Sequence, residues 1–111
     1  MTMNVKVLAL NYFKAFEEKD IDKLKQLYDD GIRLVDWTID VETKPFVLEE
    51  NKKIFQTFPT LKIQVVEIAE NQNTVIAHIL IDLDDNNQIK VCDLLKFNDQ
   101  GFITLISAFK Q

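Results

Sequence analysis

Residues 61–110, LKIQVVEIAENQNTVIAHILIDLDDNNQIKVCDLLKFNDQGFITLISAFK, decide the fold of this chain. Four apolar runs alternate here with short polar turns. The runs span residues 61–70, 74–83, 89–97 and 102–110. Runs of this length joined by short turns are typical of β-hairpins, so we predict four consecutive strands. The apolar phase changes near Val65 and Val66, which predicts a β-bulge and a bent sheet.

The chain before these strands reads as helices interrupted by one strand. Helical spacing of apolar residues predicts helices over residues 5–16, from 21 through Tyr28, and over 47–58. Alternation predicts a strand over 32–38 and a short extended piece over 39–43. Asp20 suits the N-cap of the second helix, Gly31 is expected to end it, and Pro59 stops the third. The order α-α-β-α-β-β-β-β predicts an α+β fold with its helices gathered on one face of a mostly antiparallel sheet.

The composition favours one domain over residues 1–111, because 47% hydrophobic residues supply a single core. A net charge of −5 without a long Lys or Arg cluster argues against nucleic acid as a partner. No apolar run reaches the roughly 20 residues of a membrane helix, and residues 1–4 lack the basic start of a signal peptide. We therefore expect a cytoplasmic protein with no membrane partner. One cysteine and one histidine make neither a disulfide nor a typical zinc set, so we predict no metal and no cofactor.

Two aspartates interrupt otherwise apolar strand faces. Asp93 is the only polar residue on its face of the strand over 89–97, and Asp36 shares a face with Ile32 and Leu34. Burying an unpaired carboxylate costs several kcal/mol, so each aspartate must be hydrogen-bonded or protonated. Two interpretations stay open. In the first, the aspartates are structural groups that bond turn amides or meet water. In the second, they take part in a reaction.

The last strand predicts a second copy of the chain as a partner. Ile103, Leu105 and Phe109 alternate with Thr104, Ile106 and Ala108, so both faces of the strand read as partly buried. One monomer has no second layer to cover both faces. We therefore expect a homodimer that packs through the outer face of the sheet.

Several segments resemble the nuclear transport factor 2-like superfamily over nearly the whole chain. They are NYFKAF (11–16), DID (20–22), LYDD (27–30), LVD (34–36), VCDLLKFN (91–98) and GFI (101–103). Within the superfamily, the most similar branch contains the Δ5-3-ketosteroid isomerases and the SnoaL-like polyketide cyclases. The resemblance implies a cystatin-like cone, in which a strongly curved sheet wraps three helices and encloses an apolar pocket.

The resemblance also implies roles for three residues. Tyr12, Asp36 and Asp93 match the isomerase's tyrosine on the first helix, its base after the first strand and its aspartate on the penultimate strand. Asp36 would be the base that shuttles a proton, while Tyr12 and a protonated Asp93 would donate hydrogen bonds to an enolate oxygen. The implied pocket-lining residues are Trp37, Phe16, Phe55, His78, Val91, Leu95 and Ile106. Trp37, where the isomerase has a proline, would narrow the mouth.

The implied function is a cofactor-free isomerase or cyclase acting on a small apolar carbonyl compound. A polyketide cyclase would use the same acid and base groups in a pocket of different shape. The alternative is a non-catalytic ligand-binding or dimerisation module, in which the aspartates are structural and Tyr12 is a core aromatic.

Three other motifs are weaker. Residues 82–93 begin like a calcium-binding loop, but they lack its Gly at position six and its Glu at position twelve. His78 shares a strand face with Ile76 and Leu80, which places it in the pocket as an acid/base group or in a structural role. Cys92 has no base identifiable near it and is expected in the dimer contact.

Overall fold

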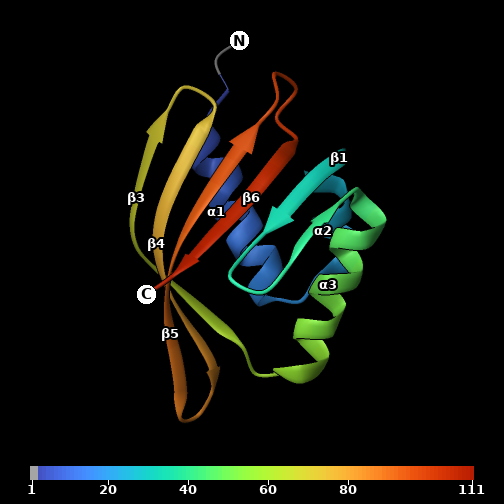
Figure 1. Cartoon of the computed structure of the whole chain (residues 1–111). Helices are drawn as coiled ribbons and strands as arrows, with labels where there is room; N and C mark the ends of the chain where they lie inside the picture. The colour runs from blue at the N-terminus through green and yellow to red at the C-terminus, as the bar shows by residue number, and fades with distance from the viewer. Residues whose placement is uncertain (1–2) are drawn as a thin grey trace.

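Three helices lie on the concave side of one curved six-stranded sheet (Figure 1). The computed structural model describes residues 3–111, so the first two residues of the predicted domain lie outside the described residues. The helices are α1 (Val5–Glu17), α2 (Ile21–Leu27) and α3 (Lys44–Thr57). The strands are β1 (Tyr28–Val35), β2 (Asp40–Glu42), β3 (Lys62–Asn71), β4 (Thr74–Asp84), β5 (Asn87–Phe97) and β6 (Ile103–Lys110). The predicted α+β fold and element order are confirmed.

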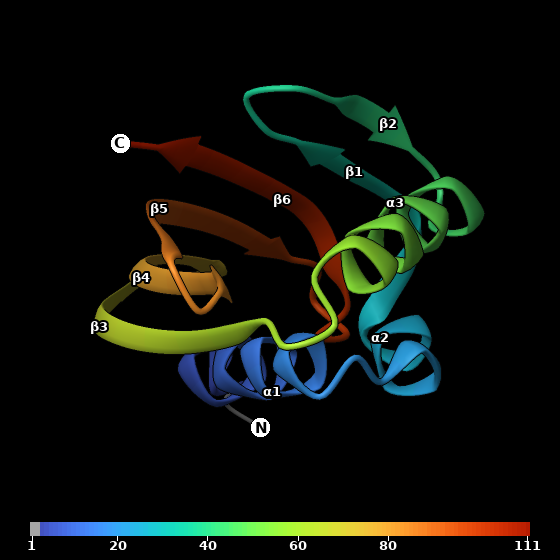
Figure 2. The ribbon, with the colours of Figure 1, turned by 90° about the horizontal axis from the view of Figure 1, so that it is seen from below.

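The strands lie in the order β2-β1-β6-β5-β4-β3, and only β1 and β6 pair in parallel. The predicted bulge is confirmed, because the register between β3 and β4 shifts between Val65 and Glu67. A bulge bends a strand and increases its twist. Figure 2 shows the consequence: the sheet curls from β3 round to β2, with α1 and α3 on its concave side.

Polar side chains fix where the helices begin. Asn4 Oδ1 accepts a hydrogen bond of 3.2 Å from the backbone N–H of Val7 at the start of α1. Asp20 Oδ1 does the same for Lys23 at 3.0 Å, so Asp20 is the predicted N-cap of α2. The third helix begins at Lys44 rather than at residue 47, because Pro45 lies in its first turn, where a missing N–H breaks no helical hydrogen bond.

The prediction that Tyr28 belongs to the second helix was wrong. Tyr28 is the first residue of β1, with an extended backbone, and its Cα faces that of Ile103 on β6. Gly31 lies inside this strand instead of ending a helix. Helical periodicity and a strand start both place Tyr28 in the core, where it is 1% exposed, so the apolar pattern could not separate the two.

The side chains of β6 do not lie on the faces predicted for them. Ile103 was assigned to the face opposite Ile106, yet both side chains are buried in the core. The register between β5 and β6 shifts so that Phe97 pairs with Ile103 and Lys96 pairs with Leu105. This irregularity leaves one extra residue, Thr104, and reverses the alternation along β6.

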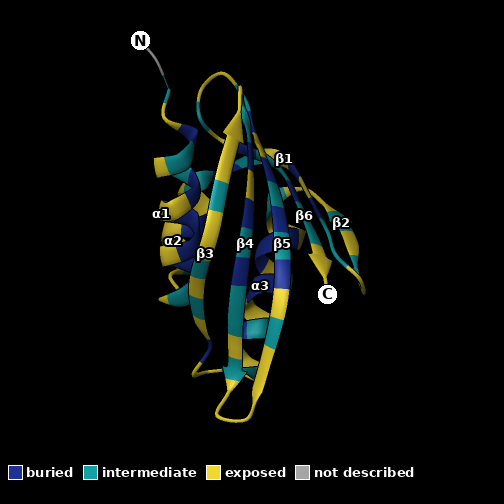
Figure 3. Cartoon of the chain, turned by 90° about the vertical axis from the view of Figure 1, so that its left-hand side faces the viewer, coloured by how far each residue is buried: buried dark blue, intermediate teal, exposed yellow. Residues whose placement is uncertain are grey.

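The outer face of the sheet keeps several apolar side chains in contact with solvent. Val66, Ile76 and Phe109 are each about half exposed or more, and Figure 3 shows exposed and half-buried residues along β3 and the tip of the β4–β5 hairpin. In the described part of the chain, no helix is both long enough and apolar enough to span a membrane.

Candidate active site

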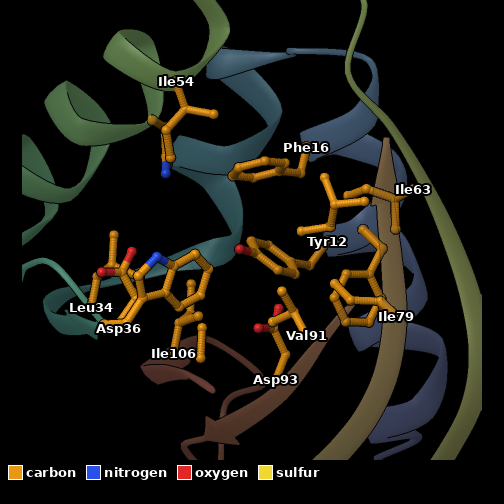
Figure 4. Close-up of a pocket in the computed structure, with 15 residues that line it drawn as sticks. Tyr12, Phe16, Leu34, Asp36, Ile54, Ile63, Ile79, Val91, Asp93 and Ile106 are labelled. Atoms are coloured by element: carbon orange, nitrogen blue, oxygen red, sulfur yellow. The ribbon is translucent and has the colours of Figure 1, made fainter. Parts of the chain in front are cut away.

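A cavity of about 80 Å³ lies between the concave face of the sheet and helices α1 and α3. Most of its wall is aliphatic or aromatic, and its polar groups are Tyr12, Asp36, Asn51 and Asp93 together with the indole of Trp37. The remaining lining residues are Phe13, Phe16, Leu34, Ile54, Ile63, Ile79, Ile81, Val91, Ile106 and Ala108. In Figure 4, Tyr12 and Asp93 present their oxygen atoms to the same space, with Asp36 on its far side.

Tyr12 comes from the buried stripe of α1 and is 4% exposed. Its ring packs against the rings of Phe13 and Phe16, with centroids 5.3 and 5.9 Å away. Burial raises the pKa of Tyr12 well above its usual value, and the neighbouring Tyr28 and Asp93 raise it further when ionised. Tyr12 therefore keeps its proton at neutral pH and can donate a hydrogen bond into the cavity.

Asp93 comes from the inward-facing row of β5 and is 6% exposed. Its neighbours across the sheet are two small residues, Ala77 on β4 and Ala108 on β6, and Ala108 lines the cavity. Burial raises the pKa of Asp93 from its usual 3.8 to about 7, and the charge of Asp36 adds to the effect. No hydrogen bond to the carboxylate offsets this shift. The side chain is thus close to half protonated at pH 7.

Asp36 follows β1 and is half buried. Its Oδ1 accepts hydrogen bonds from the backbone N–H of Thr38 at 2.7 Å, the hydroxyl of Thr38 at 3.0 Å and the backbone N–H of Ile39 at 2.9 Å. Asp36 therefore does bond turn amides, as the structural interpretation of the sequence requires. All three bonds converge on one oxygen, so Oδ2 takes no part in the turn.

Asn51 is a site residue that the sequence analysis missed. It lies on α3 at 1% exposure, lines the cavity and accepts a 2.7 Å hydrogen bond from the hydroxyl of Tyr28. The ring of Tyr28 lies 6.3 Å from that of Tyr12, centroid to centroid. The signal was present in the sequence, because Asn51 interrupts the apolar stripe of Val47 and Leu48 just as the aspartates interrupt strand faces.

Apart from His78, the other predicted pocket residues lie in or around the cavity, and they divide into two groups. Phe16, Trp37, Val91 and Ile106 line the cavity together with Tyr12, Asp36 and Asp93. Phe55 and Leu95 are buried but do not line it; Phe55 packs edge-on against Phe16 with centroids 4.9 Å apart.

The prediction that His78 lines the pocket was wrong. Its Cα faces those of Glu67 and Cys92 on neighbouring strands, on the outer side of the sheet. The opposite row of β4, from Val75 to Leu83, is wholly apolar and faces inward, whereas the row of His78 also contains Thr74, Asp82 and Asp84. The prediction rested only on the two apolar neighbours of His78 and so chose the wrong row. Among the described residues, no group of three or more His, Cys, Asp or Glu side chains could hold a metal ion.

A curved sheet wrapped on three helices is also the fold of a solved nuclear transport factor 2-like protein. The chain belongs to the SnoaL-like domain family, whose model matches residues 9–106. Among curated protein sequences, none matches this chain significantly.

Solved structures share this fold at low sequence identity. A nuclear transport factor 2-like protein of unknown function from Cytophaga hutchinsonii has a TM-score of 0.84 at 15% identity, over 100% of this chain and 93% of that one. An LEH-like epoxide hydrolase of M. tuberculosis has a TM-score of 0.84 at 14% identity, over 96% and 82%. SalBIII, an epoxide hydrolase/cyclase-like enzyme of pyran ring formation in salinomycin, has a TM-score of 0.83 at 18% identity, over 96% and 90%. These similarities establish the fold, and the activity has to be inferred from the residues of the site.

Proposed function

We propose that this protein is a cofactor-free acid/base enzyme that moves a proton next to the carbonyl of a small apolar compound. One observation carries the proposal. Tyr12 from α1, Asp36 after β1 and Asp93 from β5 line the same apolar cavity, although they are far apart in the sequence. Tyr12 and Asp93 have raised pKa values, and such groups in an apolar cavity are typical of acid/base sites.

The three groups suit different roles. Asp36 is the base, because its Oδ2 is not used by the turn and can accept a proton from the carbon beside the carbonyl. The electrons of the broken C–H bond form a C=C bond, and the carbonyl oxygen becomes an enolate oxygen. Tyr12 and the protonated Asp93 donate hydrogen bonds to that oxygen, where a low dielectric strengthens them. Return of the proton from Asp36 to a more distant carbon completes a double-bond shift.

The buried environment of Asp93 supports its role as donor. A carboxyl whose pKa is about 7 holds a proton in a large fraction of molecules at neutral pH. An enolate oxygen beside it favours the protonated form further, because two neighbouring negative charges repel in an apolar cavity. Asp93 therefore becomes a better hydrogen-bond donor as negative charge develops on the enolate oxygen.

An isomerase assay with a one-ring β,γ-unsaturated ketone tests the proposal, because its conjugated product absorbs in the ultraviolet. We expect Asp36→Asn to lower turnover by about 10²–10⁴-fold, the usual contribution of a general base. Asn keeps an Oδ1 acceptor for the turn amides of Thr38 and Ile39, so the melting temperature should change little. Asp40→Asn is the matched control, since Asp40 pairs with Arg33 outside the cavity. Equal turnover in the wild type and Asp36→Asn ends the assignment of Asp36 as base.

A non-catalytic ligand-binding module is the second candidate function. It is favoured by the three turn hydrogen bonds of Asp36, which give that carboxylate a structural role of its own. In that case ketones should raise the melting temperature of the wild type and of Asp36→Asn equally, while no product forms in either.

A further inference from the structure

Trp37 combines two properties that no other residue of the cavity wall shares to the same degree. Its indole lines the cavity beside Asp36, and its side chain is nevertheless 47% exposed. Other lining residues from the sheet, such as Val91 and Ile106, are buried. A side chain that borders both the cavity and the solvent stands at the mouth, so Trp37 decides how far a bound molecule can extend outward.

Hydrogen bonds hold the turn that carries Trp37, and a lysine holds the face of its indole. Asp36 binds the N–H groups of Thr38 and Ile39 through Oδ1, and its own N–H donates to the carbonyl of Ile39 at 2.9 Å. The ammonium of Lys110, at the end of β6, lies 5.7 Å from the centroid of the indole and attracts its face. The indole therefore has a defined place at the mouth.

The space behind the indole is small. The cavity of about 80 Å³ is several times smaller than the roughly 300–1,000 Å³ of ordinary ligand pockets. It is also about half the size of an engineered apolar cavity of about 150 Å³ that binds benzene, so the enclosed space holds a carbonyl group and a few carbons. A single ring would extend past Trp37 into the open mouth, whereas a fused-ring molecule would have to displace the indole.

We propose that Trp37 is the specificity-determining residue of this site and restricts it to compact carbonyl compounds of at most one ring. The inference rests on the proposed function and adds the substrate class to it. The other lining side chains pack in or against the core, so truncating them to enlarge the cavity would disturb core packing. Trp37 is half exposed, so its removal should open the cavity while the fold persists.

Binding of unreactive ketones of increasing size tests the inference without requiring turnover. Dissociation constants are measured by NMR titration for cyclohexanone, the two-ring decalone and the four-ring androstanedione. The proteins are the wild type, Trp37→Phe, Trp37→Ala and the control Phe46→Ala, which removes an exposed aromatic ring outside the cavity. Because Trp37 is the only tryptophan, its fluorescence also reports occupancy in the wild type and in Phe46→Ala.

We expect the wild type and Phe46→Ala to bind cyclohexanone at least tenfold more tightly than decalone. Trp37→Ala should bind decalone at least tenfold more tightly than the wild type does, with Trp37→Phe between them. Unchanged ratios of the dissociation constants of the three ketones in all four proteins would overturn the size-limiting role while leaving the proposed function intact. If no ketone binds any of the four proteins, the proposed function fails, and the substrate class fails with it.

Discussion

The hydroxyl of Tyr28 donates a 2.7 Å hydrogen bond to Oδ1 of Asn51, and both residues are 1% exposed. The bond joins the first residue of β1 to the middle of α3, and the ring of Tyr28 lies 6.3 Å from that of Tyr12, centroid to centroid. A buried polar pair of this kind is stable only while both partners are present, because either one alone leaves an unsatisfied group.

We predict that the losses of stability from removing the two partners of this pair are not additive. Tyr28→Phe leaves the Asn51 oxygen without its donor, and Asn51→Leu leaves the Tyr28 hydroxyl without its acceptor. Each change should lower the free energy of unfolding by about 1–3 kcal/mol. The double variant should lose less than the sum of the two. Urea unfolding of the four proteins measures the coupling, and strictly additive losses would show that the hydrogen bond contributes nothing specific.

The raised pKa of Asp93 predicts a stability that depends on pH. An unfolded carboxyl titrates near 3.8 and the folded one near 7, so between these values the folded state binds more protons than the unfolded state. The free energy of unfolding therefore falls as the pH rises from about 4 to 7 and levels off above. At about 1.4 kcal/mol per pKa unit, the full cost is on the order of 4 kcal/mol.

Asp93→Asn isolates this effect, because the amide does not titrate. The difference in unfolding free energy, variant minus wild type, should increase between pH 4 and 7 and become constant at higher pH. Other titrating groups are common to both proteins and cancel in the difference. Urea unfolding at pH 5, 6, 7 and 8 provides the measurement. Parallel curves for the two proteins would mean that Asp93 titrates normally in the folded state.

The apolar pattern of the sequence was sufficient for the fold and for part of the site. Alternation over residues 61–110 defined the four strands, and the phase change located the bulge after Val65. Asp36 and Asp93 were identified because a carboxylate in an apolar row of a strand is costly to bury without a partner. The apolar pattern predicts which residues are buried, but it does not predict how residues on neighbouring strands pair. The other features of the site depend on that pairing.

The error at Ile103 shows this limit, because the irregular pairing of β6 reversed the face of that residue. The error at His78 was of another kind. The opposite row of β4 is wholly apolar, whereas the row of His78 contains Thr74, Asp82 and Asp84, so the alternation already favoured an outward His78. The two residues that pair with Asp93 on the neighbouring strands, Ala77 and Ala108, are both small, and Ala108 lines the cavity. Residues on separate strands cannot be paired from periodicity, so the pocket was expected from the resemblance alone and its actual walls became visible only in three dimensions.

The outer face of the sheet leads to our last prediction, in which we propose that the protein forms a homodimer through this face. Phe109 is 60% exposed there, opposite Cys92 of β5, and Ile76 nearby is 47% exposed. Exposed apolar residues grouped on one sheet face are typical of an interface between copies. We expect light scattering to give a dimer for the wild type and a monomer for Phe109→Glu, because a charge buried without a partner opposes association. Phe102→Glu is the control, since Phe102 is 40% exposed in the turn before β6. A monomeric wild type, or equal dissociation by both variants, would contradict this interface.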